Sequence, residues 1–315
     1  MLPTLLRRKI SSAKRLTIES YYRLCGKSDL TWRYVANLRP WLEYRRNQAM
    51  LGKTNERFLG DLIGNGILIT SVGDLLNNTS LFEELEAAVQ AKEAELVREI
   101  QNARADLIRS ERIKTYLFAL LGSRPILDPG NIFARVALHP NILNLVNSYF
   151  GMLTKLRYYN VWHNFVTQEN PRESQLWHRD PEDRAVLKVF VYLTDVDATC
   201  GPLSYAPGTH LYGTIKRSAP SDLHKEGNAY VERSDDDQIA SIIPKSKWIT
   251  ATGPKGTIVV ADTRGYHKGG HVSRSDRILY ICAFTSKGSV FPETWRRESA
   301  FPLPPDKAIA FAIAH

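Results

Sequence analysis

The spacing of apolar residues changes part-way along this chain of 315 residues, and this change constrains the fold most strongly. Between Phe82 and Leu107, apolar residues recur at intervals of three, four and seven, with Glu, Lys and Arg between them. This periodicity predicts one long amphipathic helix whose apolar stripe packs on a core. After about residue 135, short β-branched or aromatic runs alternate with Gly and Pro, which is typical of strands and turns. We therefore expect a mainly β fold, a sandwich or barrel with N-terminal helices packed on its outside.

The sequence indicates several short strands and one long insertion. The predicted strands cover residues 67–70, 154–167, 185–193, 201–205, 257–261 and 277–285. Residues 218–247 are polar and rich in Asp, and they are expected to form an insertion. This insertion has two interpretations, a lid over a site and a solvated surface loop.

The net charge of +9 comes from the N-terminal end of the chain. Residues 1–60 hold 13 Lys and Arg against 4 Asp and Glu, whereas residues 61–315 hold 29 of each kind. The first part of the chain mixes Leu and Ile with basic side chains, which indicates a basic amphipathic segment. Three roles are open for it: docking on its own domain or on a neighbouring subunit, contact of residues 1–30 with an anionic membrane surface or acidic glycan, and mitochondrial targeting. No nucleic-acid motif accompanies the charge, so nucleic-acid binding is not expected.

The composition excludes two classes of protein. No stretch reaches the roughly 18 to 20 uncharged apolar residues of a membrane-spanning helix, so an integral membrane protein is not expected. The three cysteines, Cys25, Cys200 and Cys282, do not make a disulfide framework and lie too far apart for a thiolate metal site. These features predict a soluble, cytoplasmic protein in a reducing compartment, with or without peripheral attachment to a membrane.

The segment Trp177-His178-Arg179-Asp180 lies just before the strand predicted over residues 185–193 and carries two candidate metal ligands. In an extended segment, residues two apart project from the same side of the backbone, so His178 and Asp180 can reach one metal ion. A second histidine from a distant strand would complete a two-His-one-carboxylate triad. Such a triad leaves three coordination positions open for a co-substrate and dioxygen.

Four downstream histidines compete to be the third ligand. His267 follows the strand predicted over residues 257–261 and a short turn, which places it at the mouth of a barrel. We expect His267 to be the ligand, with His271 as the alternative. His210 lies in a Pro-Gly turn and His224 in the predicted insertion, so both are expected to be structural or surface residues.

Two cations are candidates for binding an anion near this metal site. Arg277 opens the strand predicted over residues 277–285, and its planar guanidinium suits a carboxylate in bidentate contact. A salt bridge to Asp276 or to a surface acid is the alternative for Arg277. Lys188 shares one side of its strand with Phe190, and if that side faces the barrel interior, its ammonium needs an anion such as a co-substrate carboxylate.

Two longer segments carry several motifs in a fixed order. Residues 177–210 read WHRDPEDRAVLKVFVYLTDVDATCGPLSYAPGTH, with a Trp-His-x-Asp, a Gly-Pro-Leu and a Pro-Gly-Thr-His. Residues 256–284 read GTIVVADTRGYHKGGHVSRSDRILYICAF, with a strand, a His followed by small residues and an Arg that begins the next strand. In both, the chain resembles the phytanoyl-CoA dioxygenase family of iron(II)/2-oxoglutarate oxygenases. A weaker similarity extends back to about Phe58.

The resemblance implies a fold, a domain division and a set of ligands. The fold is a double-stranded β-helix, the cupin-like jelly roll, over about residues 136–295, buttressed by the N-terminal α-helices. The implied division is a basic helical segment at 1–57, an oxygenase domain at 58–295 and a C-terminal tail at 296–315. The implied iron ligands are His178, Asp180 and His267, and the implied partner of the 2-oxoglutarate C5 carboxylate is Arg277. Many members place this Arg eleven residues after the distal His rather than ten, so Arg274 stays open as an alternative.

Further residues near the motif are candidates for the pocket. Asn160 is a candidate for binding the co-substrate, and Trp162 and Trp177 are candidates for contact with the substrate, although an aromatic beside a strand also serves packing. Arg179 and Arg184 flank the metal motif and could meet an acidic or phosphorylated substrate. Solvated surface charge is the alternative for these two arginines.

The resemblance implies an activity as well. We expect an iron(II)/2-oxoglutarate-dependent dioxygenase that uses O2 to hydroxylate a small molecule and releases succinate and CO2. Related halogenases replace the carboxylate by a small residue to admit halide, so Asp180 favours hydroxylation. The basic N-terminal segment favours a substrate at an anionic surface, such as a lipid-linked glycan, and a natural-product intermediate is also open. The alternative function is a non-catalytic cupin-like protein that binds or senses a metal or ligand.

Overall fold

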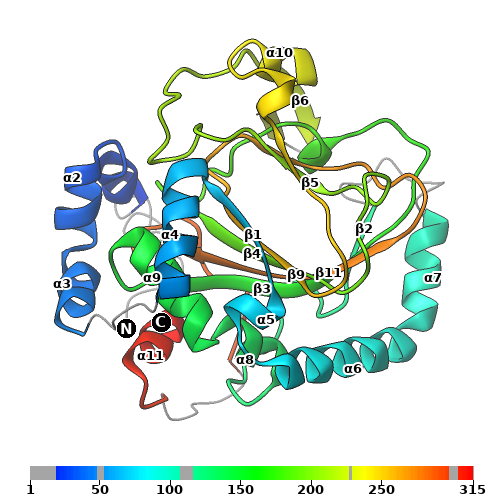
Figure 1. The fold of residues 1–315 in the computed structure, drawn as a ribbon, viewed down its shortest axis with the longest axis horizontal. Coiled ribbons are helices and arrows are strands. Elements are labelled where there is room, and N and C mark those ends of the chain that lie inside the picture. Colours follow the sequence, from blue (N-terminus) through cyan, green and yellow to red (C-terminus); the bar gives the residue numbers. More distant parts are fainter. Residues whose placement is uncertain (1–18, 48–52, 107–115, 227–228, 298–303, 315) are drawn as a thin grey trace, which may run out of the picture.

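The computed structural model describes residues 19–47, 53–106, 116–226, 229–297 and 304–314. These residues fold around a six-stranded antiparallel sheet, and a smaller sheet of three strands packs against one of its faces. Helices pack against its other face (Figure 1). The prediction of a mainly β fold with N-terminal helices outside a double-stranded β-helix is therefore confirmed.

The larger sheet joins strands that lie far apart in the sequence. Its strands, in spatial order, are β1 (Ile67–Ser71), β9 (Thr257–Asp262), β4 (Leu187–Tyr192), β11 (Arg277–Thr285), β3 (Lys155–Asn164) and β2 (Leu117–Ala119). The smaller sheet contains β10 (His267–Gly269), β5 (Leu203–Tyr205) and β8 (Ile249–Ala251). A separate hairpin consists of β6 (Asp222–Glu226) and β7 (Ala229–Arg233). Neighbouring strands in all three sheets are antiparallel.

Most of the helices precede β3 in the sequence. They are α2 (Asp29–Thr31), a π-helix (Trp32–Ala36), α3 (Leu38–Arg46), α4 (Lys53–Asn65), α5 (Val72–Leu75), α6 (Thr79–Glu95), α7 (Val97–Asp106), α8 (Ile132–Ala137) and α9 (Pro140–Phe150). Later in the chain come α10 (Asp236–Ala240), α11 (Lys307–Ile313) and two 3₁₀ turns at Glu173–Gln175 and Lys245–Lys247. Residues 19–25 are also helical.

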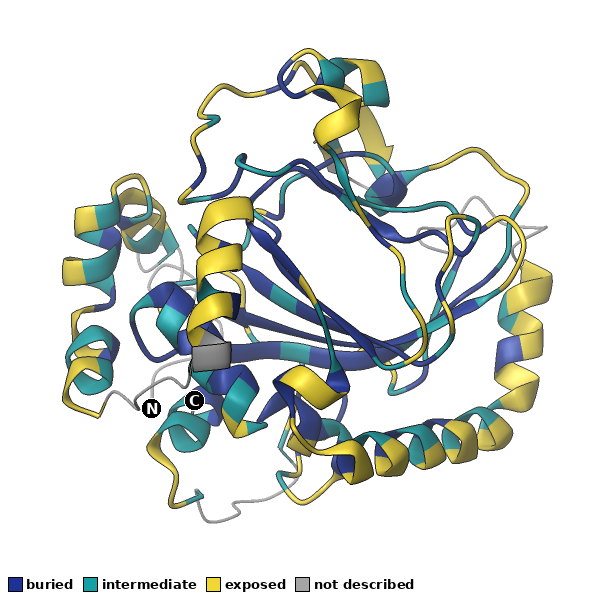
Figure 2. Cartoon of the chain, in the orientation of Figure 1, coloured by how far each residue is buried: buried dark blue, intermediate teal, exposed yellow. Residues whose placement is uncertain are grey.

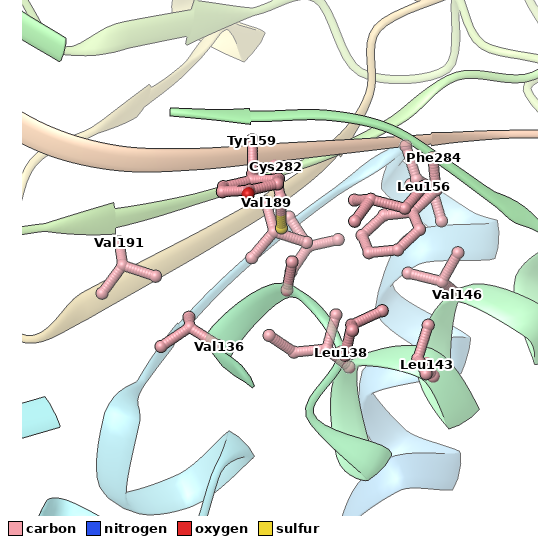
Figure 3. Close-up of a cluster of buried hydrophobic side chains, with 14 of the residues drawn as sticks. Val136, Leu138, Leu143, Val146, Leu156, Tyr159, Val189, Val191, Cys282 and Phe284 are labelled. Atoms are coloured by element: carbon pink, nitrogen blue, oxygen red, sulfur yellow. The ribbon is translucent and has the colours of Figure 1, made fainter. Parts of the chain in front are cut away.

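Alternation along the strands explains the layers of the fold. On β4, Val189 and Val191 point toward the helices, whereas Phe190 and Tyr192 point toward the smaller sheet. Figure 3 shows the helix side, where side chains of α8, α9, β3, β4 and β11 meet in one apolar cluster. Buried residues follow the strands, and exposed residues follow the outer faces of the helices (Figure 2). The space between the two sheets is lined by polar as well as apolar side chains.

The prediction of a single long helix over residues 82–107 is wrong. The structure contains two helices, α6 and α7, with a break at Leu96. Val89 of α6 packs in the large helix-side cluster, whereas Ile100 of α7 packs with Phe165 in a separate small cluster. Leu96 contacts both clusters. The helix axis changes direction between α6 and α7 (Figure 1). This bend lets the apolar side chains of α6 pack on the large cluster and those of α7 pack on the small one.

The limits of the β core also differ from the sequence-based expectation. β1 pairs with β9 although it lies well before residue 136, and α9 lies after that residue. The start of α9 has an evident signal, since Pro140 occupies the first turn, where a missing N–H costs nothing. Gly151 ends the helix with a φ of 65°, the left-handed conformation that glycine adopts without strain.

The segments at both ends of the chain share this core. Trp32 is buried in the helix-side cluster, and its Nε1 donates to Asp183 Oδ1 at 2.8 Å. Ile313 of α11 is buried in the same cluster. Residues 1–18, which include much of the segment predicted to contact a membrane, lie outside the described residues. Within the described ranges, no helix combines the length and apolarity needed to cross a membrane.

The predicted insertion at residues 218–247 contains β6, β7 and α10. Ile239 and Ile243 from this insertion are buried against Trp177, and Ser234 pairs with Trp177 through two backbone hydrogen bonds of 2.9 and 3.1 Å. The insertion is therefore anchored beside the metal motif by its own apolar cluster.

Candidate active site

Backbone pairing brings the predicted metal ligands together from distant parts of the sequence. His178 N donates to His267 O at 2.9 Å, and His267 N donates to His178 O at 3.1 Å. Asp180 N donates to Thr263 O at 2.9 Å. The segment before β4 is thus fastened to the segment around β10, which aims all three side chains into the space between the sheets.

The three side chains are arranged to share one ion. His178 Nε2 lies 3.7 Å from Asp180 Oδ1, and His267 Nε2 lies 3.6 Å from Asp180 Oδ2. One ligand atom from each residue lies within 4.8 Å of the others, and all three residues are buried. Across the described ranges, no other group of three His, Cys, Asp or Glu side chains has this geometry.

Both imidazoles are held in the form that a metal requires. His178 Nδ1 lies 2.9 Å from Leu176 O, and His267 Nδ1 lies 3.1 Å from Gly265 O. A carbonyl oxygen can only accept, so each Nδ1 carries the proton and each Nε2 keeps its lone pair for the ion. Burial lowers the pKa of both histidines, and for His178 the neighbouring His267 lowers the pKa further. Neutral imidazoles therefore face the carboxylate.

Asp180 is kept ionised by a buried ion pair. Lys188 Nζ lies 2.5 Å from Asp180 Oδ2. Burial opposes the charge of Asp180, but the ammonium of Lys188 outweighs burial and holds the pKa of Asp180 below its ordinary range. Burial likewise opposes the charge of Lys188, and Asp180 outweighs it and raises the pKa of Lys188. Lys188 shares the inner face of β4 with Phe190, as predicted, and the anion that it meets is Asp180.

Arg277 is a buried cation without an acidic partner. Its side chain enters the same space as the triad and is 7 % exposed. Among the described residues, no carboxylate lies within ion-pair distance of Arg277, and its Nε has no hydrogen-bond partner. Burial lowers the pKa of Arg277. The predicted alternative partner, Asp276, instead pairs with Arg104 and with His163 Nε2, the latter at 2.7 Å.

These residues line one cavity of about 110 Å³, which we call the metal cavity. Its wall combines the triad and the two cations with aromatic, apolar and amide side chains from both sheets. The lining residues that the sequence analysis missed include Tyr116, Gln175, Tyr192, Leu203 and Leu279. Strand alternation from Lys188 was a signal for Tyr192, whereas nothing near Tyr116 in the sequence points to this cavity.

The other candidate residues occupy different places. Trp162 lines the metal cavity. Asn160 accepts from Leu121 N at 3.2 Å and donates to Gly122 O at 2.8 Å, so its amide holds the loop after β2. Trp177 lies outside the cavity wall and donates to Asp236 Oδ1 at 2.6 Å, which anchors the insertion. Roles of Asn160 and Trp177 in ligand binding stay predictions.

Arg179 and Arg184 line a second, separate cavity. Arg274, the alternative to Arg277, is exposed. None of the competing histidines, His210, His224 and His271, belongs to the group of side chains that could hold a metal ion. His210 Nε2 bonds to Ile63 O at 3.0 Å, whereas His224 is exposed on β6.

Comparison with known proteins identifies the family. The sequence profile described as phytanoyl-CoA dioxygenase (PhyH) matches residues 81–278. This span is more than half of the chain, and it includes His178, Asp180, His267 and Arg277. The chain belongs to the phytanoyl-CoA dioxygenase family. Together with the buried His–Asp–His triad, membership makes it an iron(II)/2-oxoglutarate-dependent oxygenase, which confirms the predicted family, enzyme class and cofactors.

Several solved structures are similar to this phytanoyl-CoA dioxygenase family member. The carbocyclase SnoK from nogalamycin biosynthesis is 18 % identical with a TM-score of 0.47, over 75 % of this chain and 84 % of that one. EctD from S. alaskensis with 2-oxoglutarate and 5-hydroxyectoine is 15 % identical with a TM-score of 0.46, over 76 % and 78 %. The epimerase SnoN with Fe3+, alpha ketoglutarate and nogalamycin RO is 16 % identical with a TM-score of 0.44, over 76 % and 86 %. No curated protein matches the sequence.

The donor set of the metal cavity fits the family's cofactors. Two neutral imidazoles and one carboxylate on one face of an ion suit iron(II), and they leave positions for further ligands. No carboxylate of the described residues pairs with the buried guanidinium of Arg277, and a 2-oxoglutarate carboxylate would provide such a partner.

Proposed function

We propose that this oxygenase hydroxylates a C–H bond of a small molecule and converts 2-oxoglutarate and O2 to succinate and CO2. The observation that supports this most directly is the buried Arg277, which lies in the same cavity as the triad and pairs with no acidic side chain of the described residues. A buried cation that lacks a protein partner is costly unless a ligand pairs with it. A dicarboxylate co-substrate would meet Arg277 at one end and the ion at the other.

Each residue of the metal cavity has a defined task in this proposal. His178, Asp180 and His267 hold iron(II), which when bound supplies the activation of O2 toward the substrate. Arg277 binds and orients the C5 carboxylate of 2-oxoglutarate through its planar fork. Lys188 positions Asp180, because its ammonium keeps that carboxylate ionised and turned toward the imidazoles.

The outcome of the reaction follows from the same residues. Asp180 occupies the position that related halogenases leave free for halide, so transfer of oxygen to the substrate is favoured. Trp162, Phe190 and Leu203 give the cavity an apolar wall, which suits the hydrocarbon part of a substrate. We assign Trp162 to contact with that part.

Labelling with isotopically heavy dioxygen tests this function. The purified protein is incubated with iron(II), 2-oxoglutarate and a small-molecule extract, and both products are analysed by mass spectrometry. Hydroxylation places one heavy oxygen atom in succinate and one in the organic product. His178→Ala removes both labels, whereas His224→Ala, a change on an exposed hairpin, retains them. Label in succinate with an organic product that gains no oxygen atom would contradict hydroxylation.

A further inference from the structure

A second cavity, of about 710 Å³, lies behind the metal motif. Arg179 lines this cavity, whereas its neighbours His178 and Asp180 line the metal cavity, as alternation in an extended segment requires. The two cavities have no lining residue in common. We call this second space the basic cavity, because its wall includes Arg23, Lys27, Arg179, Arg184, Lys216 and Arg264.

Arg179 and Arg264 form the centre of positive charge. The guanidinium of Arg179 stacks 4.0 Å over the ring of Tyr266, and its buried Nε has no hydrogen-bond partner. Arg264 donates to the backbone oxygen of Asp180 at 2.7 Å. Among the described residues, the hydrogen bonds of the two guanidiniums go to backbone oxygens, from Arg179 to Thr209 O at 3.4 Å and from Arg264 to Asp180 O, and neither forms an ion pair with a carboxylate. Both side chains line the basic cavity.

The acids in this wall do not neutralise the pair. Both carboxylate oxygens of Asp183 are used, by Trp32 Nε1, by Ser286 N and by Arg184 N, at 2.7 to 2.8 Å. The wall holds six Lys and Arg side chains against two carboxylates, Glu182 and Asp183. The cavity therefore keeps an excess of positive charge.

The N-terminal segment adds to this excess. Arg23 and Lys27 line the basic cavity from the helical residues 19–25 and the turn that follows. Arg184 joins the two parts of the wall, since it donates to Gly26 O at 2.9 Å. Part of the positive charge that distinguishes residues 1–60 thus lies around the basic cavity.

We propose that the basic cavity binds a phosphate-bearing ligand, with Arg179 and Arg264 as its principal contacts. Guanidinium groups bind phosphate oxygens in pairs of parallel hydrogen bonds, and two of them without a carboxylate fit one multiply charged anion. The phosphate belongs either to a free small molecule or to a lipid headgroup. Because the metal cavity has a separate lining, this ligand is distinct from the 2-oxoglutarate co-substrate.

Calorimetric titration of the full chain with inorganic pyrophosphate, at constant ionic strength, tests the proposal. We expect saturable binding that Arg179→Gln and Arg264→Gln each weaken by about tenfold or more, since each removes charged hydrogen bonds. Arg135→Gln is the matched control, because Arg135 lies outside the basic cavity and pairs with Glu84 on the surface. If Arg264→Gln does not fold, Lys216→Gln replaces it.

A second arm identifies the source of the phosphate. The same variants are mixed with phosphatidylcholine vesicles with and without phosphatidic acid. Binding of pyrophosphate supports a free ligand, and binding only to vesicles that contain phosphatidic acid, lost in Arg179→Gln, supports a headgroup. Absence of both kinds of binding, or equal binding by all variants, overturns the proposal. Decarboxylation of 2-oxoglutarate by the same preparation is measured separately, so either proposal can fail without the other.

Discussion

Replacing Arg277 by Met should stabilise the protein in the absence of co-substrate and weaken co-substrate binding. The guanidinium of Arg277 is buried without an acidic partner among the described residues, and such a charge costs several kcal/mol. Met keeps much of the volume and suits the neighbouring Leu279. Allowing for packing that is lost, we expect a gain of about 1 to 3 kcal/mol in the free energy of unfolding.

The loss of co-substrate affinity is larger. Two charge-assisted hydrogen bonds to a carboxylate contribute about 3 kcal/mol together, which corresponds to a rise of about 100-fold in the Kd of 2-oxoglutarate. Urea unfolding measures the first effect and anaerobic titration the second. Arg274→Met, an exposed arginine on the same segment, should change stability by no more than about 0.5 kcal/mol. If Arg277→Met lowers the stability and leaves the Kd unchanged, Arg277 has a structural role and the reasoning is refuted.

Three further predictions concern the ion pairs and the core. Burial opposes protonation of His163, but its hydrogen bonds to Asp276 and Glu93 outweigh burial and raise the pKa of His163. Protonated His163 therefore stabilises the fold below about pH 6.5, and this stabilisation is lost as the pH rises through the pKa of His163 in the folded protein. His163→Gln should flatten the dependence of unfolding free energy on pH in that range, and an unchanged slope contradicts the assignment. Lys188→Met removes the ammonium that opposes the effect of burial, so the pKa of Asp180 should rise and iron binding should fail at a higher pH than in the wild type. If iron affinity has the same pH dependence in both proteins, Lys188 does not keep Asp180 ionised. Leu143→Ala in the helix-side cluster should cost about 2 to 5 kcal/mol in urea unfolding with no change in iron affinity, and a smaller cost means that the cluster refills the space.

Much of the fold could be predicted because local patterns agree with the final packing. The runs that became β4, β9 and β11 are apolar along their length, and these strands lie between the helix layer and the smaller sheet. The His178–Asp180 spacing in an extended segment was sufficient to place both side chains on one side. The break between α6 and α7 could not be predicted, because it depends on where two apolar surfaces meet in the folded chain.

In the site, local alternation along a strand could be predicted from the sequence, whereas contacts between distant segments could not. Lys188 was predicted to face inward by alternation, but its partner Asp180 became evident only with the strands in place. Arg179 was grouped with the metal motif because it is adjacent in sequence, although alternation sends it to the opposite side. Asn160 faces the loop after β2, a contact between segments that no spacing in the sequence encodes.

Anaerobic visible spectroscopy with iron(II) and 2-oxoglutarate tests the central claim most directly. A chelated keto acid on a His–Asp–His iron site gives a charge-transfer absorption band, so the wild type should develop this band. His178→Ala should abolish the band, whereas His224→Ala should leave it unchanged. No band from a folded, iron-loaded wild type, or an equal band from His178→Ala, would contradict the assignment of this cavity as the oxygenase site.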